Sequence, residues 1–393
     1  MKVLRIVRSM NPAQGGVVEA INQAALVFNS GKNQMSVLCL DEPDSPWVLE
    51  CDHYKIHAIG EGKTAYGFHF GYLSWIWKNS SNYDVVIIDG LWQFLVFGGY
   101  ILKLMKVPYC VFVHGMLDPY FNNDKLKYIK KLPFWFLSER NVIALAGATV
   151  FTCKEESILA ENSLPFYRAN AVVSTLGVEE VIKDSEELIN KFTSKFYCLK
   201  NKRFALFLSR IHEKKGIDML IDALGDIDEL PADFMLAIAG PDSNGLQAEL
   251  TDHIKSLGLT DRIVWLGMLS GDIKWGAYHA ADVFVLPSHQ ENFGIVVAEA
   301  LSTATSVLIT NKVNIWREIY AAGAGIVEND DVEGVKNLLY KWFRLTDIEK
   351  NTMHANAKIC HKIYFSIESA ASDLEGILSN VLQVSKASKS VRS

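Results

Sequence analysis

Residues 281–300 read ADVFVLPSHQENFGIVVAEA, and this stretch decides the fold. The run Val283–Pro287 is apolar, as a parallel strand that is covered on both faces requires. Pro287 and Ser288 break the strand, and a short loop leads to a helix that we expect to begin near Phe293. This order predicts an open parallel sheet, in which ligands bind at the carboxyl ends of the strands.

The same alternation of strands and helices continues in both directions along the chain. Strand-like runs occur at Lys2–Val7, Met35–Leu40, Val85–Asp89, Tyr109–His114, Ala148–Thr152, Phe204–Leu208, Phe234–Ala239, Ile263–Leu266, Val283–Pro287 and Val307–Thr310. Helical patterns separate them, for example at Val17–Phe28, Ile217–Leu224, Leu246–Leu257 and Phe293–Leu301. The pattern predicts the α/β class, with parallel sheets covered by helices.

Chain length and local composition predict two domains. The 393 residues suffice for two domains of roughly 150–200 residues each. Residues 179–203 are charged and have little strand pattern, so we expect a linker there between domains at 1–178 and 204–362. Residues 363–384 have a helical pattern, and the polar residues 385–393 are expected to form a flexible tail.

Charge and composition argue against several classes of protein. The net charge of −6 gives no basic field for a nucleic acid. Six widely spaced cysteines without a C-x-x-C pair predict free thiols rather than a disulfide framework or a zinc site. The first residues lack the apolar run of a signal peptide, and the stretch from Leu91 to Val113 is interrupted by Lys103, Lys106 and Pro108. We therefore expect a cytoplasmic protein.

Two glutamates flank the start of the helix in the deciding stretch. Glu291 and Glu299 are eight positions apart, which on one helix would separate them by ~12 Å along the axis. Each carboxylate could accept hydrogen bonds from the paired hydroxyls of a ribose or hexose. The alternative is that either glutamate is a solvated helix charge. The free N–H groups at the helix start, over Asn292, Phe293, Gly294 and Ile295, suit a phosphate.

A second motif, Leu208 to Gly216, also lies between a strand and a helix. It reads LSRIHEKKG and carries Arg210 and Lys215. A diphosphate leaving group develops negative charge as the bond to the sugar breaks, and two cations can stabilise that charge without a metal. The alternative is a basic surface turn.

The first half of the chain contributes two weaker motifs. Gly15 and Gly16 follow the first strand and precede a helix, so the backbone there can approach a phosphate closely. The full G-x-G-x-x-G pattern is absent, which argues against an ordinary dinucleotide-dependent dehydrogenase. His114 ends a strand and could donate a hydrogen bond to a sugar hydroxyl, although a structural histidine explains it equally well.

Together these motifs resemble the family-4, group-1 retaining glycosyltransferases of GT-B fold. The resemblance covers most of the chain and is strongest from Phe204 to Thr310. The matching positions are Glu291 and Glu299 of the E-x7-E motif, Arg210 and Lys215 of the diphosphate clamp, the Gly15–Gly16 loop, His114 and the turn Thr175–Val178.

The resemblance implies two Rossmann-like domains facing a central cleft, with the acceptor side in 1–178 and the nucleotide sugar in 204–362. The helix at 363–384 would cross back to the first domain. Glu299 would hold the ribose, Glu291 the transferred sugar and His114 the same sugar. Gly240, Pro241 and Leu269 would lie on the nucleotide side. The donor would be a UDP-sugar or GDP-sugar, and the resemblance implies neither a further cofactor nor a metal.

The implied function is the retaining transfer of a hexose-type sugar to a saccharide or polyprenyl-linked acceptor in cell-surface polysaccharide synthesis. A nucleotide-sugar epimerase and a non-catalytic nucleotide- or carbohydrate-binding subunit are the alternatives. Two departures from the family pattern concern the identity of the sugar. Asn292 stands where the family often has a small residue, and Ala304–Val307 reads ATSV where Gly-Thr-Pro-Val is common.

The segment 119–140 interleaves basic and aromatic residues. Lys125, Lys127, Lys130 and Lys131 lie beside Phe134, Trp135 and Phe136, a composition typical of a segment at a membrane interface. An inward aromatic face with a solvated basic face explains the pattern equally well. Membrane contact would place the protein at the inner face of the membrane.

Overall fold

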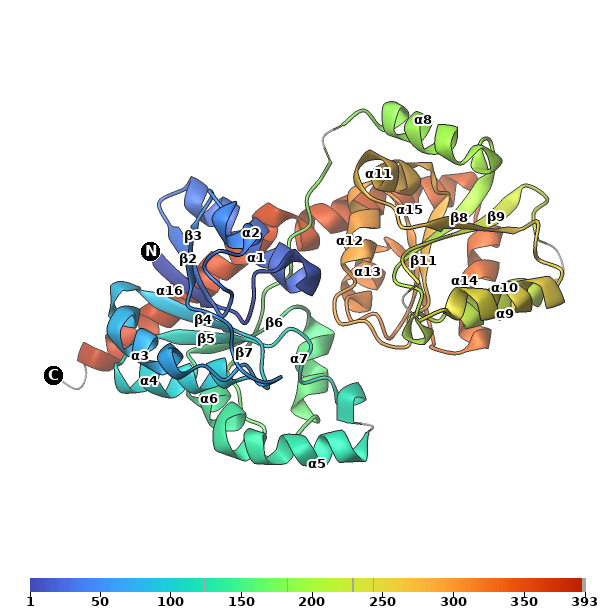
Figure 1. Cartoon of the computed structure of the whole chain (residues 1–393). Helices are drawn as coiled ribbons and strands as arrows, with labels where there is room; N and C mark the ends of the chain where they lie inside the picture. Colours follow the sequence, from blue (N-terminus) through green and yellow to red (C-terminus); the bar gives the residue numbers. More distant parts are fainter. Residues whose placement is uncertain (123, 182, 228–229, 243, 391–393) are drawn as a thin grey trace. The chain divides into compact units, whose positions relative to one another are not determined.

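The computed structural model describes the chain except for residues 123, 182, 228–229, 243 and 391–393 (Figure 1). The chain divides into two compact units. The first consists of Met1–Gly177 together with Ile367–Ser393, and the second of Val178–Ser366. Each unit is built on a sheet whose named strands pair in parallel, with helices packed against it, so the predicted α/β class is confirmed.

In the first unit the strands follow the order β3-β2-β1-β4-β5-β6-β7. Their bounds are β1 Lys2–Ile6, β2 Gln34–Cys39, β3 Lys55–Ala58, β4 Val85–Asp89, β5 Tyr109–Phe112, β6 Ala148–Phe151 and β7 Ala171–Val173. The helices are α1 Gly16–Ser30, α2 Pro46–Leu49, α3 Phe70–Asn79, α4 Gly98–Leu104, α5 Lys125–Phe134, α6 Arg140–Leu145, α7 Lys154–Glu161 and α16 Ile367–Ser390. A π-helical turn, Trp135–Glu139, joins α5 to α6.

In the second unit the order is β10-β9-β8-β11-β12-β13. The strands are β8 Arg203–Leu208, β9 Phe234–Ala239, β10 Ile263–Gly267, β11 Val283–Leu286, β12 Val307–Thr310 and β13 Gly325–Glu328. The helices are α8 Ser185–Lys195, α9 Ile217–Gly225, α10 Leu246–Ser256, α11 Gly271–Ala280, α12 Ile295–Ser302, α13 Trp316–Ala322, α14 Val332–Arg344 and α15 Asp347–Cys360. A π-helical turn, His361–Phe365, follows α15.

The ten predicted strands are all present, within one or two residues of the predicted ends. The central strands β4, β5, β6, β11 and β12 are buried at every position, which is why their apolar runs are continuous. Sequence analysis missed β3, β7 and β13. Each of these lies at an edge of its sheet and is only partly buried, so it lacks such a run.

The segment predicted as a linker, 179–203, contains the amphipathic helix α8. Leu188 and Phe192 of α8 are buried against α11, where a Cβ at Gly276 would lie 2.2 Å from the carbonyl oxygen of Leu188. The segment therefore belongs to the second unit, which begins at Val178. Its high charge reflects the solvated face of a packed helix rather than a linker.

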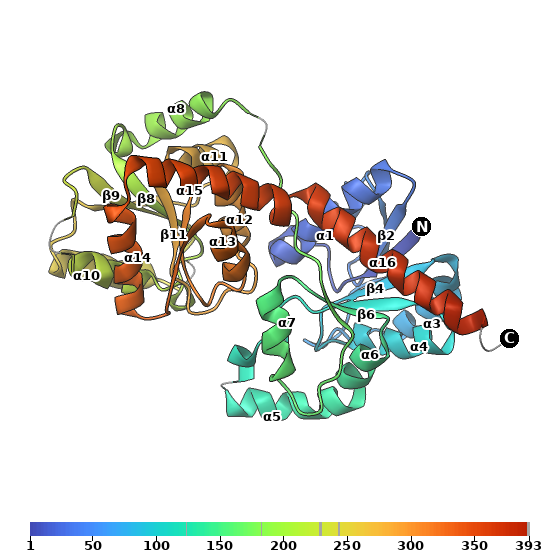
Figure 2. The same ribbon diagram turned by 180° about the vertical axis from the view of Figure 1, so that it is seen from behind.

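The C-terminal helix differs from its predicted bounds of 363–384. The π-helical turn covers the first of those residues, α16 begins at Ile367, and it continues to Ser390 through most of the predicted tail. Residues 391–393 of that tail lie outside the described residues. Helix α16 belongs to the first unit and runs beside α1 (Figure 2). None of the helices in the described part of the chain has the length and apolar character to cross a bilayer.

Candidate functional site

The sheet of the second unit reverses its strand order between β8 and β11. The connections that leave these two neighbouring strands diverge, and a crevice at the carboxyl edge of the sheet follows from this topology. The loop after β8 carries Arg210 and Lys215, and the loop after β11 carries Glu291. The structure thus places the two strongest predicted motifs on neighbouring loops of one sheet edge.

Backbone hydrogen bonds tie the loops at this edge to one another. The bonds run from Ile211 N to Pro241 O, from His289 N to Lys214 O, from Glu291 N to Lys312 O and from Gly240 N to Gly267 O, each at 2.9 Å. Gly240 has φ of 142°, and a Cβ there would lie 1.7 Å from the carbonyl oxygen of Ser209. Only glycine therefore allows the loops after β8 and β9 to pack this closely.

Lys215 forms an ion pair with Glu291 at the centre of this edge. The side chain of Lys215 is 10% exposed and that of Glu291 is 21% exposed, so both remain accessible to a ligand. Gly216 makes the approach possible because its φ is 65° and a Cβ would lie 2.1 Å from the carbonyl oxygen of Pro287. A lysine ammonium has three N–H donors, and the bond to Glu291 uses one of them.

Arg210 lies on the same loop as Lys215 but is exposed. Among the described residues its guanidinium makes no ion pair or side-chain hydrogen bond. An arginine presents five N–H donors in a planar fork, so this side chain keeps its full capacity to bind an oxyanion.

Glu299 lies on α12 and is held by two side chains from α11. Lys274 Nζ lies 2.8 Å from Glu299 Oε1, and the Tyr278 hydroxyl donates to Glu299 Oε2 at 2.9 Å. Burial, together with the Glu299 carboxylate, raises the pKa of Tyr278 well above its usual value, so this hydroxyl stays a donor. Sequence analysis missed Lys274 and Tyr278, and their only sequence signal is an i, i+4 spacing on one helix.

The start of α12 lies two residues later than predicted, because Gly294 adopts a left-handed conformation with φ of 76° as its N-cap. Asn292 and Phe293 therefore belong to the loop, and Ile295 is the first helical residue. Phe293 is 4% exposed and packs edge-on against Phe365 at 5.7 Å, so its side chain serves the core. Of the residues predicted to lie near the nucleotide, Pro241 is exposed and Leu269 is buried.

In the first unit, the predicted glycine loop lies between β1 and α1. Gly15 is the N-cap of α1 and has φ of 77°. A Cβ at this position would meet no atom within 4 Å, so there is room for a side chain. The glycine is thus required by the backbone conformation rather than by crowding, and Gly16 begins the helix. Asp41 anchors the same loop through Ser9 Oγ at 2.6 Å and Met10 N at 2.7 Å.

His114 follows β5 and forms a buried cluster with Asp89 and Arg5. His114 Nε2 lies 2.8 Å from Asp89 Oδ1, and Arg5 donates through Nε to Asp89 Oδ2 at 2.9 Å and through Nη2 to Oδ1 at 2.5 Å. Burial alone would raise the pKa of Asp89, but Arg5, with the hydrogen bonds from Arg5 and His114, lowers it to about 2. Sequence analysis missed both partners.

A second buried carboxylate, Glu156, holds the backbone next to His114. Glu156 Oε1 accepts a hydrogen bond from Gly115 N at 2.6 Å, and Oε2 accepts bonds from Thr152 N at 2.7 Å and Thr152 Oγ1 at 2.6 Å. Burial raises the pKa of Glu156, and these hydrogen bonds oppose the increase. The ring of His114 stacks on Phe112 at 4.4 Å, so both its ring and its backbone are fixed.

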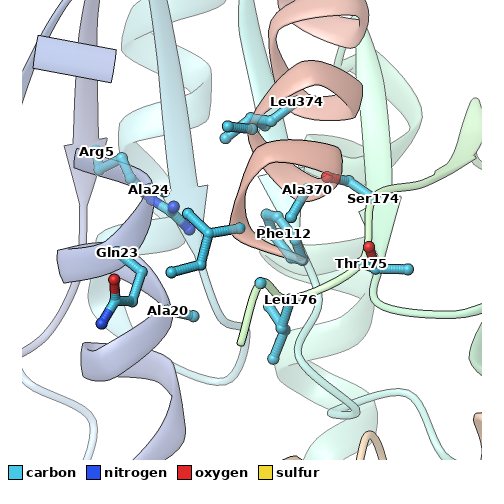
Figure 3. Close-up of a pocket in the computed structure, with 13 residues that line it drawn as sticks. Arg5, Ala20, Gln23, Ala24, Phe112, Ser174, Thr175, Leu176, Ala370 and Leu374 are labelled. Atoms are coloured by element: carbon cyan, nitrogen blue, oxygen red, sulfur yellow. The ribbon is translucent and has the colours of Figure 1, made fainter. Parts of the chain in front are cut away.

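Figure 3 shows a small pocket next to this cluster, within the first unit. It is lined by Arg5, Phe112 and Thr175 together with residues of α1 and α16. Its volume of about 20 Å³ admits about one water molecule, too little for a sugar or a nucleotide. The pocket therefore belongs to the packing between α1 and α16 rather than to a ligand site.

Comparisons with known proteins bear on the second unit most directly. Residues 190–359 match the family described as "Glycosyl transferases group 1". The match lies wholly within the second unit and covers most of it. The match contains Arg210, Lys215, Glu291 and Glu299, and it begins within α8, the helix in the segment predicted as a linker.

Curated relatives match over part of their length. The chain is 36% identical over 126 residues to an uncharacterized glycosyltransferase of Methanocaldococcus jannaschii, 30% over 149 residues to mannosylfructose-phosphate synthase of Agrobacterium fabrum, and 28% over 141 residues to the lipopolysaccharide core mannosyltransferase LpsB of Rhizobium meliloti. These matches cover 32%, 36% and 34% of this chain and span 31%, 33% and 39% of those proteins, about a third of their length.

Solved structures match nearly the whole chain. Anabaena HepE in complex with UDP has a TM-score of 0.77 at 19% identity, over 96% of this chain and 100% of that chain. Sucrose-phosphate synthase from Thermosynechococcus elongatus has a TM-score of 0.73 at 14% identity, over 98% and 100%. These likenesses show the GT-B fold, with two Rossmann-like parallel-sheet domains.

The carboxyl edge of the second sheet offers complementary groups to a phosphorylated sugar. Lys215 and Arg210 supply positive charge, and the start of α12 supplies backbone N–H groups. Glu291 and Glu299 supply hydrogen-bond acceptors for hydroxyl groups. Within the described residues, no three His, Cys, Asp or Glu side chains gather as a metal-binding group.

Proposed function

We propose that the chain is a retaining glycosyltransferase that moves a hexose-type sugar from a UDP-sugar or GDP-sugar to a saccharide or polyprenyl-linked acceptor, in cell-surface polysaccharide synthesis. The observation that carries this proposal is the Lys215–Glu291 ion pair, with Arg210 on the same loop, at the switch point of a group 1 domain. A cation that contacts a carboxylate at one sheet edge matches a donor whose charged diphosphate adjoins a sugar.

Each residue then has a defined task. The two remaining N–H donors of Lys215 and the fork of Arg210 stabilise the diphosphate as the sugar bond breaks, without a metal. Glu291 accepts hydroxyls of the transferred sugar, and Glu299 accepts those of the ribose. Backbone groups of Gly240 and residues 292–295 lie on the nucleotide side, with Pro241 and Leu269 beside them. In the first unit, we assign the Gly15–Gly16 loop to a phosphate and His114 to a sugar hydroxyl.

The chemistry balances without a nucleophile from the protein. The bond from the anomeric carbon to the diphosphate oxygen breaks, and the acceptor oxygen bonds to the same face of that carbon. The departing diphosphate takes the proton of the acceptor hydroxyl. The anomeric configuration of the donor is therefore kept.

Relatives support the choice of substrates. Anabaena HepE was solved with UDP-glucose as well as with UDP, and LpsB is named as a mannosyltransferase of the lipopolysaccharide core. The HepE complexes support a nucleotide sugar as donor, and the name of LpsB supports a cell-surface saccharide as acceptor.

Helix α5 supports a contact with an anionic membrane at its inner face. None of the residues of α5 is buried, and Leu126 and Ile129 are 72% and 60% exposed. Lys125, Lys127 and Lys130 are exposed on the same helix, and each lysine near an anionic surface contributes about 1 kcal/mol. We expect wild-type protein to sediment with anionic liposomes at low salt and a variant with Lys125, Lys127, Lys130 and Lys131 changed to glutamate to stay in solution. Equal behaviour of the two would exclude this contact.

The test of the function is a screen of donors followed by a transfer assay. We expect one of the UDP-, GDP- or ADP-sugars to raise the melting temperature, because it binds the native state. The same donor should then lose its sugar only when a saccharide or polyprenyl-linked acceptor is added. Isomerisation of the donor without an acceptor would indicate an epimerase, and binding without turnover would indicate a binding subunit. Either result would overturn the proposal.

A further inference from the structure

The loop after β4 places a tryptophan at the ligand-binding edge of the first sheet. The strand order of this sheet reverses between β1 and β4, and ligands bind at the carboxyl ends of the strands at such a point. Trp92 lies in the loop after β4 and has a left-handed backbone conformation, with φ of 60°. Bulky residues rarely adopt this conformation, and strain of this kind concentrates at functional sites. Trp92 therefore marks this edge as a candidate for ligand binding.

A hydrogen bond and ring packing hold the side chain of Trp92 in place. Its Nε1 donates to the carbonyl oxygen of Met116 at 3.1 Å, in the loop after β5. The centres of the Trp92 ring and the fully buried Trp135 ring are 6.4 Å apart. Trp92 itself is only partly buried. The edge of the sheet thus presents a fixed aromatic ring that keeps part of its surface open to solvent.

Lys131 of α5 lies against this ring with its charged end. Its Nζ is 5.1 Å from the centre of the Trp92 ring and 5.8 Å from that of Phe121, a residue that is 38% exposed. Cation–π attraction to two rings positions the ammonium. It leaves the three N–H donors of the ammonium without an oxygen acceptor.

The charge of Lys131 lacks a compensating carboxylate. In the part of the chain that the structure describes, its side chain makes no ion pair and no hydrogen bond, whereas Lys127, one turn earlier, pairs with Asp124 at 3.5 Å. Burial, together with the like charge of Lys127, lowers the pKa of Lys131. Lys131 is half-buried rather than enclosed, so a ligand can reach it. A bound anion would offset both the desolvation and the repulsion.

We propose that Lys131, positioned by Trp92 and Phe121, binds the phosphate group of a lipid-linked acceptor. The proposal rests on the proposed function and selects the polyprenyl-linked acceptor over a free saccharide. An ammonium is a compact cation with three N–H donors, which suits the oxygens of a phosphate. The three residues come from three separate segments of the first unit, and the ring contacts bring them together.

Two features favour the acceptor over the donor as the source of this phosphate. The diphosphate of the donor is already assigned to Lys215 and Arg210, which lie in the second unit. Helix α5 carries the exposed residues Leu126 and Ile129, which would contact the bilayer that holds a lipid-linked acceptor. The helix that meets the membrane therefore also presents a cation to a phosphate at the membrane surface.

Binding can be measured without any donor. The probe is citronellyl phosphate, and citronellol, which lacks only the phosphate, is its control. The indole N–H signal of Trp92 in ¹⁵N-labelled protein, assigned with a Trp92→Phe variant, reports binding. We expect citronellyl phosphate to shift this signal, citronellol to leave it unchanged, and Lys131→Met to weaken binding of the phosphate by about tenfold or more. Equal shifts by the two compounds, or undiminished binding in Lys131→Met, would overturn the proposal.

Two further variants separate the charge of Lys131 from its packing. Lys131→Arg keeps the charge and can keep the contact with the rings, so it should bind the probe nearly as well as wild type. Lys130→Met is the matched control, because Lys130 is the exposed neighbour on the same helix, and its binding should be unchanged. The free energy of unfolding is measured for each variant. A Lys131→Met variant that loses stability and binds citronellyl phosphate normally would show a purely structural lysine.

A vesicle assay distinguishes the phosphate of an acceptor from phospholipid headgroups. Vesicles of phosphatidylcholine and phosphatidylglycerol, without any acceptor, are sedimented with wild-type protein and with Lys131→Met. We expect the two proteins to sediment to the same extent, because Lys131 is half-buried beside the rings rather than on the exposed face of α5. Weaker sedimentation of Lys131→Met would assign this lysine to headgroups in general and would contradict the proposal.

The transfer reaction separates this proposal from the proposed function. One saccharide acceptor is compared in two forms, linked to citronellyl diphosphate or directly to citronellol, and hydrolysis of the donor without acceptor is measured beside them. We expect wild type to favour the diphosphate form by about tenfold or more in kcat/KM, and Lys131→Met to lose this preference through KM with hydrolysis unchanged. Equal use of the two forms would refute the phosphate site and leave the proposed function standing. Neither transfer nor hydrolysis with any donor would count against the proposed function, while the binding of citronellyl phosphate would still decide whether Lys131 holds a phosphate.

Discussion

Replacing Lys215 by methionine removes one positive charge from the carboxyl edge of the second sheet and keeps an unbranched side chain of similar length. The ammonium of Lys215 contacts Glu291, and the side chain is 10% exposed, so the apolar stem already lies in the protein. Methionine can occupy that space without the charge. The variant therefore separates the electrostatic contribution of Lys215 from its packing.

Two effects of different size are expected. Loss of one preorganised donor to the developing charge of a transition state lowers kcat by about 10²–10³, or roughly 3–4 kcal/mol. Stability should fall less, by roughly 1–3 kcal/mol, because Glu291 loses a charge-assisted hydrogen bond but, being 21% exposed, still contacts water. Combining Lys215→Met with Glu291→Gln should restore most of the stability and none of the activity.

The assay compares kcat at saturating donor with the free energy of unfolding in denaturant. Lys350→Met is the matched control, because Lys350 pairs with Asp282 at 3.8 Å and the two side chains are 9% and 20% exposed, close to the values for Lys215 and Glu291. Asp282 precedes β11, at the opposite edge of the same sheet. We expect the control to lose stability and keep its kcat. A kcat within about threefold of wild type in Lys215→Met, or an equal loss in Lys350→Met, would refute the reasoning, since one preorganised contact is worth far more.

Three further changes are expected to act on different quantities. Arg210→Ala should slow turnover by about a hundredfold with an unchanged melting temperature, because the side chain is exposed and has no partner among the described residues; kinetics and a thermal melt check this. Lys274→Met should weaken UDP binding by about tenfold in calorimetry, because Glu299 loses one of the two groups that orient it. Glu139→Gln should change the pH dependence of unfolding. Burial raises the pKa of Glu139 from 4.5 to about 7, and the hydrogen bond from Ser138 opposes this increase. The stability contributed by the protonated form is therefore present below pH 4.5 and lost as the pH rises through 7. Wild type should lose roughly 3 kcal/mol more than the variant between pH 5 and pH 8 in denaturant titrations, and parallel curves would contradict the assignment.

The central part of the fold could be predicted because buried parallel strands have a distinct sequence signature. A strand covered on both faces is apolar at every position, as in β11 and β12, and the loop that follows it must break the pattern. The edge strands β3, β7 and β13 are partly exposed, so their sequences resemble those of loops. Helix α8 was missed because its charged face dominates its composition, whereas its buried face consists mainly of Leu188 and Phe192.

The candidate site could be predicted only where a motif is local in sequence. Glu291 and Glu299 lie within the stretch 281–300. Arg210 and Lys215 lie within a second short motif, Leu208 to Gly216. The partners that hold such residues come from elsewhere in the chain. Lys274 on α11 reaches Glu299 on α12 across 25 positions of sequence, which no local pattern encodes. Arg5 meets Asp89 across 84 positions, so in the sequence it is merely a charge within an apolar strand.

The two units each place an ion pair at the same point of the same topology. In each sheet the strand order reverses between two neighbouring strands, β1 and β4 in the first unit and β8 and β11 in the second. In the first unit, Arg5 of β1 pairs with Asp89 of β4. In the second unit, Lys215 from the loop after β8 pairs with Glu291 from the loop after β11. The degree of burial decides what each pair can do. Arg5 and Asp89 are 2% and 0% exposed, so neither side chain is open to a ligand. Lys215 and Glu291 are 10% and 21% exposed, and because each keeps unused hydrogen-bonding capacity, they can bind a phosphorylated sugar directly.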